Sequence, residues 1–183
     1  MRIAWFTPFG AASALGAHSA SVTAQLARLA DVDIWTADDD PLLKTPLRVM
    51  RFPRDGAPDG YDAVFHNIDG AASEAAVSHP GIVILHGALE APPPPRSLGV
   101  ITHSAAHARA LAQRLLEPVR SLEPLPADDY AAALIEFVAE VQRATPALEL
   151  LDRVAAELAT MRAAPGLAVY GALAGDFGRF LVL

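Results

Sequence analysis

The sequence contains no cysteine among its 183 residues. This absence excludes a disulfide framework, a thiolate nucleophile and any zinc or iron–sulfur centre that is held by cysteine. Lysine occurs only at Lys44 and the arginines are scattered, so no basic run is present that would hold the chain on an anionic membrane surface. With 14 basic and 21 acidic residues the formal net charge is −7, which disfavours a nucleic-acid partner, because such binders need a basic surface.

Long apolar runs are missing as well. No stretch reaches the roughly 18 consecutive apolar residues of a membrane-spanning helix. The start of the chain also lacks the basic segment and the small-residue cleavage site of a signal peptide. We therefore expect a cytoplasmic protein without a membrane span. Its length and its hydrophobic share of 52% predict one domain with a substantial core.

Short apolar runs alternate with segments of helical periodicity along most of the chain. The clearest strand is 81–86, Gly-Ile-Val-Ile-Leu-His, because a continuous apolar run is typical of a parallel strand that is covered on both faces. Further strands are expected at 2–6, 31–36, 47–52, 61–67, 98–103 and 119–122, and helices at 18–30, 71–78, 105–116, 129–143 and 147–162. This alternation predicts an α/β fold, a Rossmann-like doubly wound and mostly parallel sheet with the C-terminal helices packed on it.

Proline and serine suggest where several of these elements begin and end. Four consecutive prolines within 91–95 predict an extended connector, and Pro146 is expected to separate the last two helices. Ser19 and Ser21 are expected to cap the first helix. The apolar segments 167–170 and 177–183 are compatible with strands or with a helix-ended tail. We expect a single domain over 1–183, with a core at 1–125 and a helical extension at 128–183.

Polar side chains follow the apolar runs at the point where ligands usually bind to open parallel sheets, beyond the carboxyl ends of the strands. They are His66, Asn67, His86, His103 and Ser104. Imidazole titrates near neutral pH and forms hydrogen bonds with hydroxyls or phosphate, so the group predicts a site for a polar ligand. The alternative is that each residue is simply polar where a strand meets water. A metal site is disfavoured because no carboxylate accompanies these histidines at the spacing of a metal-binding motif, and no cofactor is expected.

The small-residue segment 8–17 joins the first strand to the first helix. It lacks the G-x-G-x-x-G pattern, so a dinucleotide-binding fingerprint is not supported. Its small residues would still let backbone N–H groups approach a phosphate or a sugar, with Gly16, Ala17 and His18 as candidate ligand-binding residues. An ordinary connection is equally compatible with this composition. A small hydrolase is disfavoured because no G-x-S-x-G elbow surrounds Ser104.

Six segments together form a family pattern. They are the strand and loop at 1–8, Gly-Ala-His-Ser at 16–19, Asp-Val-Asp-Ile at 31–34, Tyr-Asp-Ala-Val with Asn67 at 61–67, His-Pro-Gly-Ile-Val-Ile-Leu-His at 79–86, and Leu-Gly-Val-Ile-Thr-His-Ser at 98–104. This pattern resembles the N-terminal domain of bacterial GT-B-type retaining glycosyltransferases of the glycogen-synthase-like group. The helix around 130–137 is similar to one near the C-terminus of such enzymes.

The resemblance implies the acceptor side of a hexosyl transfer. His86 would face the reacting sugar as the catalytic residue, although Gly87 stands where the family has aspartate. We expect the family's donor-binding domain to be missing, because no glutamate pair at its E-x7-E spacing is followed here by the Gly-rich phosphate loop of the family. We therefore expect the acceptor-side half of a sugar transferase, which would meet a nucleotide sugar or a glycan acceptor and would be inactive alone or would act with a partner transferase. The alternative is a noncatalytic scaffold domain that forms a homodimer through its C-terminal helices.

Overall fold

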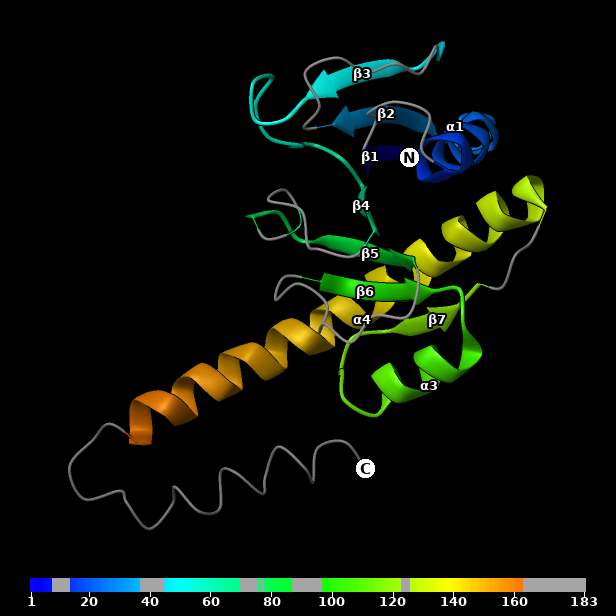
Figure 1. Cartoon of the computed structure of the whole chain (residues 1–183). Helices are drawn as coiled ribbons and strands as arrows, with labels where there is room; N and C mark the ends of the chain where they lie inside the picture. Colours follow the sequence, from blue (N-terminus) through cyan, green and yellow to red (C-terminus); the bar gives the residue numbers. More distant parts are fainter. Residues whose placement is uncertain are drawn as a thin grey trace. The chain divides into compact units, whose positions relative to one another are not determined.

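A computed structural model of the chain describes residues 1–7, 14–36, 45–69, 76, 78–86, 97–122 and 126–162 (Figure 1). The chain divides into two compact units, Met1–Arg143 and Ala144–Leu183. The first unit contains the whole sheet. In the second unit the described residues form the C-terminal part of one helix.

The sheet has seven strands in the order β3-β2-β1-β4-β5-β6-β7, and every neighbouring pair is parallel. The strands are β1 (Arg2–Phe6), β2 (Asp31–Thr36), β3 (Arg48–Arg51), β4 (Ala63–Asp69), β5 (Gly81–His86), β6 (Ser97–Thr102) and β7 (Val119–Ser121). This arrangement confirms the predicted Rossmann-like α/β fold. The strand order reverses between β1 and β4, which is the topological switch point where such sheets bind ligands.

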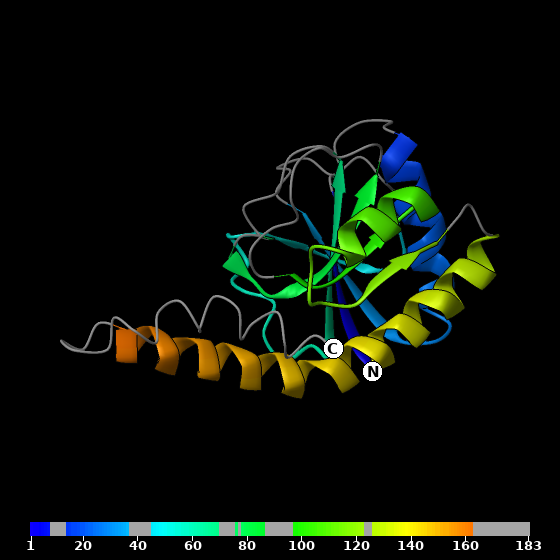
Figure 2. The ribbon, with the colours of Figure 1, turned by 90° about the horizontal axis from the view of Figure 1, so that it is seen from below.

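Helices cover both faces of the sheet. They are α1 (Ala14–Leu26), α3 (Ala105–Ala112) and α4 (Ala127–Arg162). Within the first unit, α1 and the start of α4 contribute to one core cluster and α3 contributes to another, so these helices lie on opposite faces (Figure 2). Although α4 is 36 residues long, no helix within the described ranges is both long and apolar enough to cross a membrane.

The alternation of side chains along each strand builds the core on these two faces. Buried strand residues on the α1 and α4 face include Ile3, Trp5, Phe65, Ile82, Ile84 and Ile101. They pack against Val22 and Leu26 of α1 and against Tyr130, Leu134, Phe137 and Val141 of α4. On the other face, Ile68, Val83, Leu85 and Val100 pack with Leu111 of α3.

The start of α4 lies close against β6 and β7. A Cβ atom added at Gly99 of β6 would lie 2.7 Å from Val141 Cγ2 and 3.1 Å from the Phe137 ring, so only glycine fits this approach without a shift. On β7, the Arg120 guanidinium forms ion pairs with Glu136 at 3.6 Å and with Glu140 at 2.7 Å. Apolar packing and ion pairs thus fix this part of α4 to the sheet.

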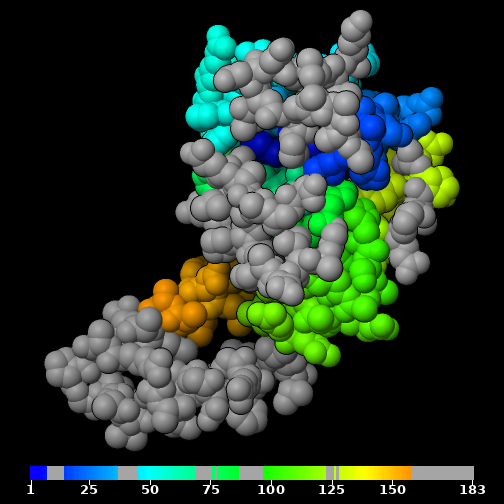
Figure 3. Space-filling model, in the orientation of Figure 1, coloured from blue at the N-terminus to red at the C-terminus, as the bar shows by residue number. Residues whose placement is uncertain are grey.

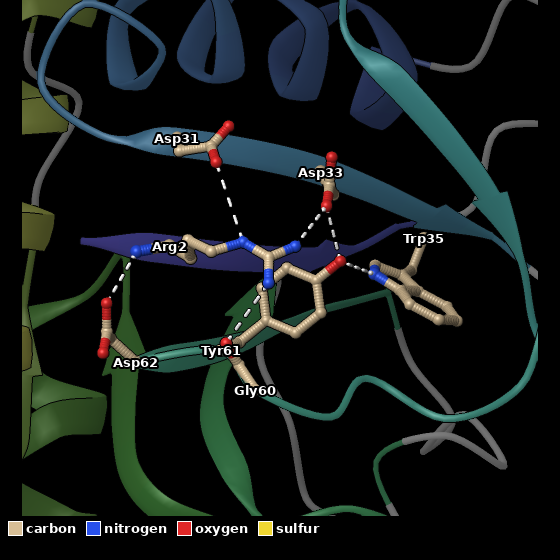
Figure 4. Close-up of polar contacts among 7 residues, drawn as sticks. All are labelled: Arg2, Asp31, Asp33, Trp35, Gly60, Tyr61 and Asp62. Carbon is tan, nitrogen blue, oxygen red and sulfur yellow. Dashed lines mark hydrogen bonds and ion pairs between the residues drawn. The ribbon is translucent and has the colours of Figure 1, made fainter.

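A polar network lies near the amino ends of the strands, away from the switch point (Figure 4). The buried Asp33 carboxylate accepts hydrogen bonds from Arg2 Nη2 at 3.2 Å and from the Tyr61 hydroxyl at 2.6 Å. Trp35 Nε1 donates to the same hydroxyl at 3.2 Å, and Asp62 accepts from the Arg2 backbone N–H at 2.7 Å. Burial, followed by the bond to Asp33, raises the pKa of Tyr61. This satisfied network ties β1 and β2 to the segment before β4.

The C-terminal helices differ from the prediction. Instead of two helices separated at Pro146, α4 is continuous from Ala127 to Arg162 with Pro146 inside it. A proline removes one backbone hydrogen bond, and it is tolerated where its neighbours favour helix strongly, as the alanine, leucine and glutamate residues on both sides do.

The first helix also begins earlier than predicted. Since α1 begins at Ala14, Ser19 and Ser21 lie inside the helix and do not cap it. The segment before α1 consists of small residues, which give no periodic signal from which the start of the helix could be predicted. The helix α3 ends at Ala112 instead of residue 116. The expected connector at 91–95, most of the expected helix at 71–78 and the segments 167–170 and 177–183 lie outside the described residues.

Candidate functional site

Four polar residues continue the apolar face of the sheet at its carboxyl edge. Each stands two positions after a buried residue of the α1 and α4 face, so its side chain lies on the same face. The pairs are Trp5 and Thr7, Phe65 and Asn67, Ile84 and His86, and Ile101 and His103. Thr7 directly follows β1 and Asn67 lies in β4, the two strands that flank the switch point. Strand periodicity therefore directs these side chains to the place where the fold binds ligands.

Asn67 is the centre of a hydrogen-bonded group. Its Nδ2 donates to Ser19 Oγ at 2.7 Å and to Thr7 Oγ1 at 3.4 Å, and its Oδ1 accepts from His86 Nε2. The two hydroxyl oxygens lie 2.9 Å apart. Because an amide oxygen can only accept, Nε2 of a neutral His86 ring must carry the proton. Thr7, Ser19 and Asn67 are all buried. Their hydrogen-bonded group therefore fixes the His86 ring from the interior of the protein.

His103 is held by the backbone that follows β7. Its Nδ1 donates to the carbonyl oxygen of Leu122 at 2.9 Å. A carbonyl accepts only, so a neutral His103 ring carries its proton on Nδ1 and a lone pair on Nε2. This Nε2 is buried and has no hydrogen-bond partner among the described residues. The backbone thus selects one tautomer and leaves a proton acceptor at the site.

The rings of His18, His86 and His103 meet at this edge, and we call them the imidazole cluster. Centroids lie 4.6 Å apart for His86 and His103, 5.8 Å for His18 and His86, and 6.2 Å for His18 and His103. Tyr130 stacks on His103 at 5.8 Å and meets the His18 ring edge-on at 5.5 Å. The atoms of α1 and those of the 97–122 segment accordingly adjoin in the space-filling view (Figure 3).

Burial shapes the electrostatics of the cluster. It lowers the pKa of His18, and the nearby His103 lowers it further. Burial also raises the pKa of Tyr130, whose hydroxyl has no hydrogen-bond partner within the described residues. Two imidazolium charges at these distances repel each other, so the cluster disfavours simultaneous protonation of neighbouring rings.

Four of the predicted site residues come together, namely His18, Asn67, His86 and His103. Gly16 is buried in the first turn of α1 and Ala17 is exposed on the same helix. Ser104 is the N-cap of α3, where its Oγ accepts from the His107 backbone N–H at 3.3 Å. The ligand-binding roles assigned to these three residues stay predictions.

His66, although it was grouped with the strand-end residues, lies on the opposite face from Asn67. Its ring stacks on Phe6 with centroids 5.1 Å apart, and its Nε2 contacts the carbonyl oxygen of His79 at 3.1 Å. Burial lowers the pKa of His66 to about 4. The side chain is therefore a neutral part of the core. The alternation of side chains along β4 predicts this position, because Phe65 and Asn67 lie on one face of the sheet and His66 lies on the other.

Three residues of the site were not predicted for it, namely Thr7, Ser19 and Tyr130. Thr7 follows the first strand, so the same rule that selected Asn67 and His86 could have selected it. Ser19 was interpreted as a cap, and Tyr130 approaches through a contact between residues far apart in sequence. Among the described residues, no group of three or more histidine, cysteine or acidic side chains has the arrangement of a metal site.

Comparisons with protein-family models, curated proteins and solved structures gave no match for this chain. The site combines an amide, two hydroxyls, three imidazoles and a phenol at the switch point.

Proposed function

We propose that the chain is a glycosyltransferase-like cytoplasmic domain that binds a sugar or glycan acceptor at the carboxyl edge of its sheet, as the acceptor-side half of a hexosyl transferase. The observation that carries the proposal is the convergence of Asn67, His86, His103 and His18 beside the topological switch point. The GT-B-like pattern of the sequence supports it.

The chemistry of the site suits a polyhydroxylated ligand. The imidazole nitrogens offer both donors and acceptors, which sugar hydroxyls require, while the buried amide and hydroxyl groups orient the His86 ring. The imidazole rings offer flat surfaces of the kind that line small-molecule sites. A few well-placed polar groups beside aromatic rings can orient a sugar ring.

His86 is the residue we propose to face the reacting sugar. Its bond to Asn67 fixes both the tautomer and the direction of the ring before any ligand arrives. Sugar transfer passes through an oxocarbenium-like transition state, and a preoriented imidazole next to the sugar can stabilise the charge that develops there. In the hexosyl transfer that we propose, the donor would come from a partner transferase.

A thermal-shift titration with neutral oligosaccharides, nucleotide sugars and nucleoside diphosphates tests this proposal. A ligand at 100 times its dissociation constant should add about 2.7 kcal/mol to the free energy of unfolding. We expect the shift to disappear in His86→Ala and to persist in the matched control His79→Ala, whose ring contacts Phe52 instead of the cluster. A complete panel without any shift would contradict ligand binding, and an unaltered shift in His86→Ala would remove this residue from the site.

We also propose self-association through the C-terminal part of α4 as the alternative function. The observation in its favour is Leu150, which is 54% exposed in the second unit. An exposed leucine on a helix becomes buried when a second copy covers it. Sedimentation velocity should then show a concentration-dependent dimer that Leu150→Glu abolishes. A monomer at every concentration would contradict this alternative.

A further inference from the structure

Among the described residues, imidazole, phenol and carbonyl groups surround the rings of His18 and His103. The groups that face His103 are His86 from β5, His18 from α1, Tyr130 from α4 and the carbonyl oxygen of Leu122. Those that face His18 are the same tyrosine and the other two imidazoles. Among the described residues, no carboxylate forms an ion pair with His18 or His103.

The buried Nε2 of His103 is unsatisfied in either protonation state. When neutral, it is an acceptor without a donor, and when protonated, it is a donor without an acceptor. A buried polar atom without a partner costs about 1–3 kcal/mol, and a charged one costs more. An anionic oxygen placed at this atom would satisfy the protonated form and neutralise its charge.

Two further features favour negative charge at the same place. His18 stands one turn after the start of α1, a helix of 13 residues whose N-terminus carries a partial positive charge. The pKa of His18 is lowered first by burial and second by His103, so a second proton enters the cluster readily only when negative charge arrives with it.

We propose that the imidazole cluster of His18, His86 and His103 is a proton-linked oxyanion site, which binds a phosphate or carboxylate group and takes up a proton with it. This inference rests on the proposed function, because it names a charged group of the ligand that binds at the same edge. The linkage has a definite sign. Binding favours the imidazolium form, so the affinity rises as the pH falls, by up to about tenfold per pH unit for one proton.

Isothermal titration calorimetry with inorganic sulfate and with D-glucuronate tests the inference, because neither probe changes its charge between about pH 6 and about pH 8. Sulfate represents a phosphate and glucuronate represents a carboxylate. We expect at least one probe to bind about tenfold or more tightly at the lower pH. Measurements in two buffers of different ionisation enthalpy should show uptake of about one proton.

The variant His103→Gln keeps a polar side chain that cannot titrate, so it should bind the probe with an affinity that no longer depends on pH. His18→Gln, on the surface of α1, provides a second variant if the first fails to fold, and His79→Gln is the matched control that should keep the wild-type pH dependence. A pH-independent affinity, a proton uptake of zero or no binding of either probe at both pH values would overturn the inference. Binding of a neutral glycan with pH-independent affinity would overturn it too, while leaving the proposed function intact.

Discussion

At the scale of single residues, Asn67 connects the two strands of the switch point to the imidazole cluster. The variant Asn67→Leu keeps the branched shape of the side chain but removes its hydrogen bonds with Ser19, Thr7 and His86. Buried polar groups that lose a partner destabilise a protein by about 1–3 kcal/mol, so we expect a loss of this size in urea denaturation. Gln142→Leu is the matched control, because Gln142 makes an exposed bond and should change stability by less than about 0.5 kcal/mol. Equal stability of Asn67→Leu and wild type would contradict a structural role for this amide.

His66 makes the stability of the fold depend on pH. Burial lowers its pKa from 6.5 to about 4 in the folded state, so the unfolded chain binds more protons between these values. The contribution of His66 is therefore complete above pH 6.5 and is lost as the pH falls towards 4, by about 3 kcal/mol in total. The lowered pKa of His18 acts in the same direction.

Urea denaturation at a series of pH values measures this dependence. In His66→Phe the ring can still stack beside Phe6 but cannot titrate, so the curve of stability against pH should become flatter below pH 6.5. The control Gln142→Leu removes no titratable group and should retain the wild-type slope. A slope that is unchanged in His66→Phe would show that other groups cause the acid destabilisation.

At the scale of elements, the approach of α4 to β6 depends on Gly99. A Cβ atom at this position would lie 2.7 Å from Val141 Cγ2, so Gly99→Ala forces one of the two elements to shift. Overpacking of this kind costs about 1–3 kcal/mol, which chemical denaturation can measure. The penalty should be smaller in the Val141→Ala background, because that change removes the clashing methyl group. Full additivity of the two substitutions would contradict the contact.

Because α4 continues across Pro146, replacement of this proline should stabilise the helix, whereas Gly99→Ala should destabilise the protein. Within a helix, proline is about 3 kcal/mol less favourable than alanine, whereas at the first position of a separate helix it is well tolerated. Pro146→Ala should therefore raise the helix content and slow amide exchange in 144–157. Unchanged or faster exchange would favour the two-helix arrangement that the sequence predicts.

At the scale of the whole molecule, the elements that the sequence located best include three strands of the sheet. The bounds expected for β1, β2 and β5 agree with the observed ones. In β1 and β5, burial on both faces leaves an uninterrupted apolar run between polar or glycine residues, whereas β2 was located by the alternation of polar and apolar residues at its start. The start of α1 was misplaced because small residues give no periodic signal. The break at Pro146 was wrong because strong helix formers on both sides compensate for one lost hydrogen bond.

The site could be predicted where it depends on strand ends, and it could not where it depends on tertiary contacts. Asn67, His86 and His103 lie at or next to the carboxyl ends of parallel strands, which meet at one edge of the sheet. Tyr130 belongs to α4 and is far from His103 in sequence. The sequence therefore does not predict the contact between their rings. The tautomer of His103 likewise depends on the Leu122 carbonyl, which no local pattern indicates.

The presence of a ligand site at this edge can be tested most directly by NMR titration, through the Cε1–H resonances of the six histidines. On addition of the glycans and nucleotide sugars of the thermal-shift panel, we expect the resonances of His18, His86 and His103 to shift together, while those of His66 and His79 stay in place. Resonances of the cluster that do not move with any ligand, or shifts confined to the other histidines, would contradict a ligand site at the carboxyl edge of the sheet.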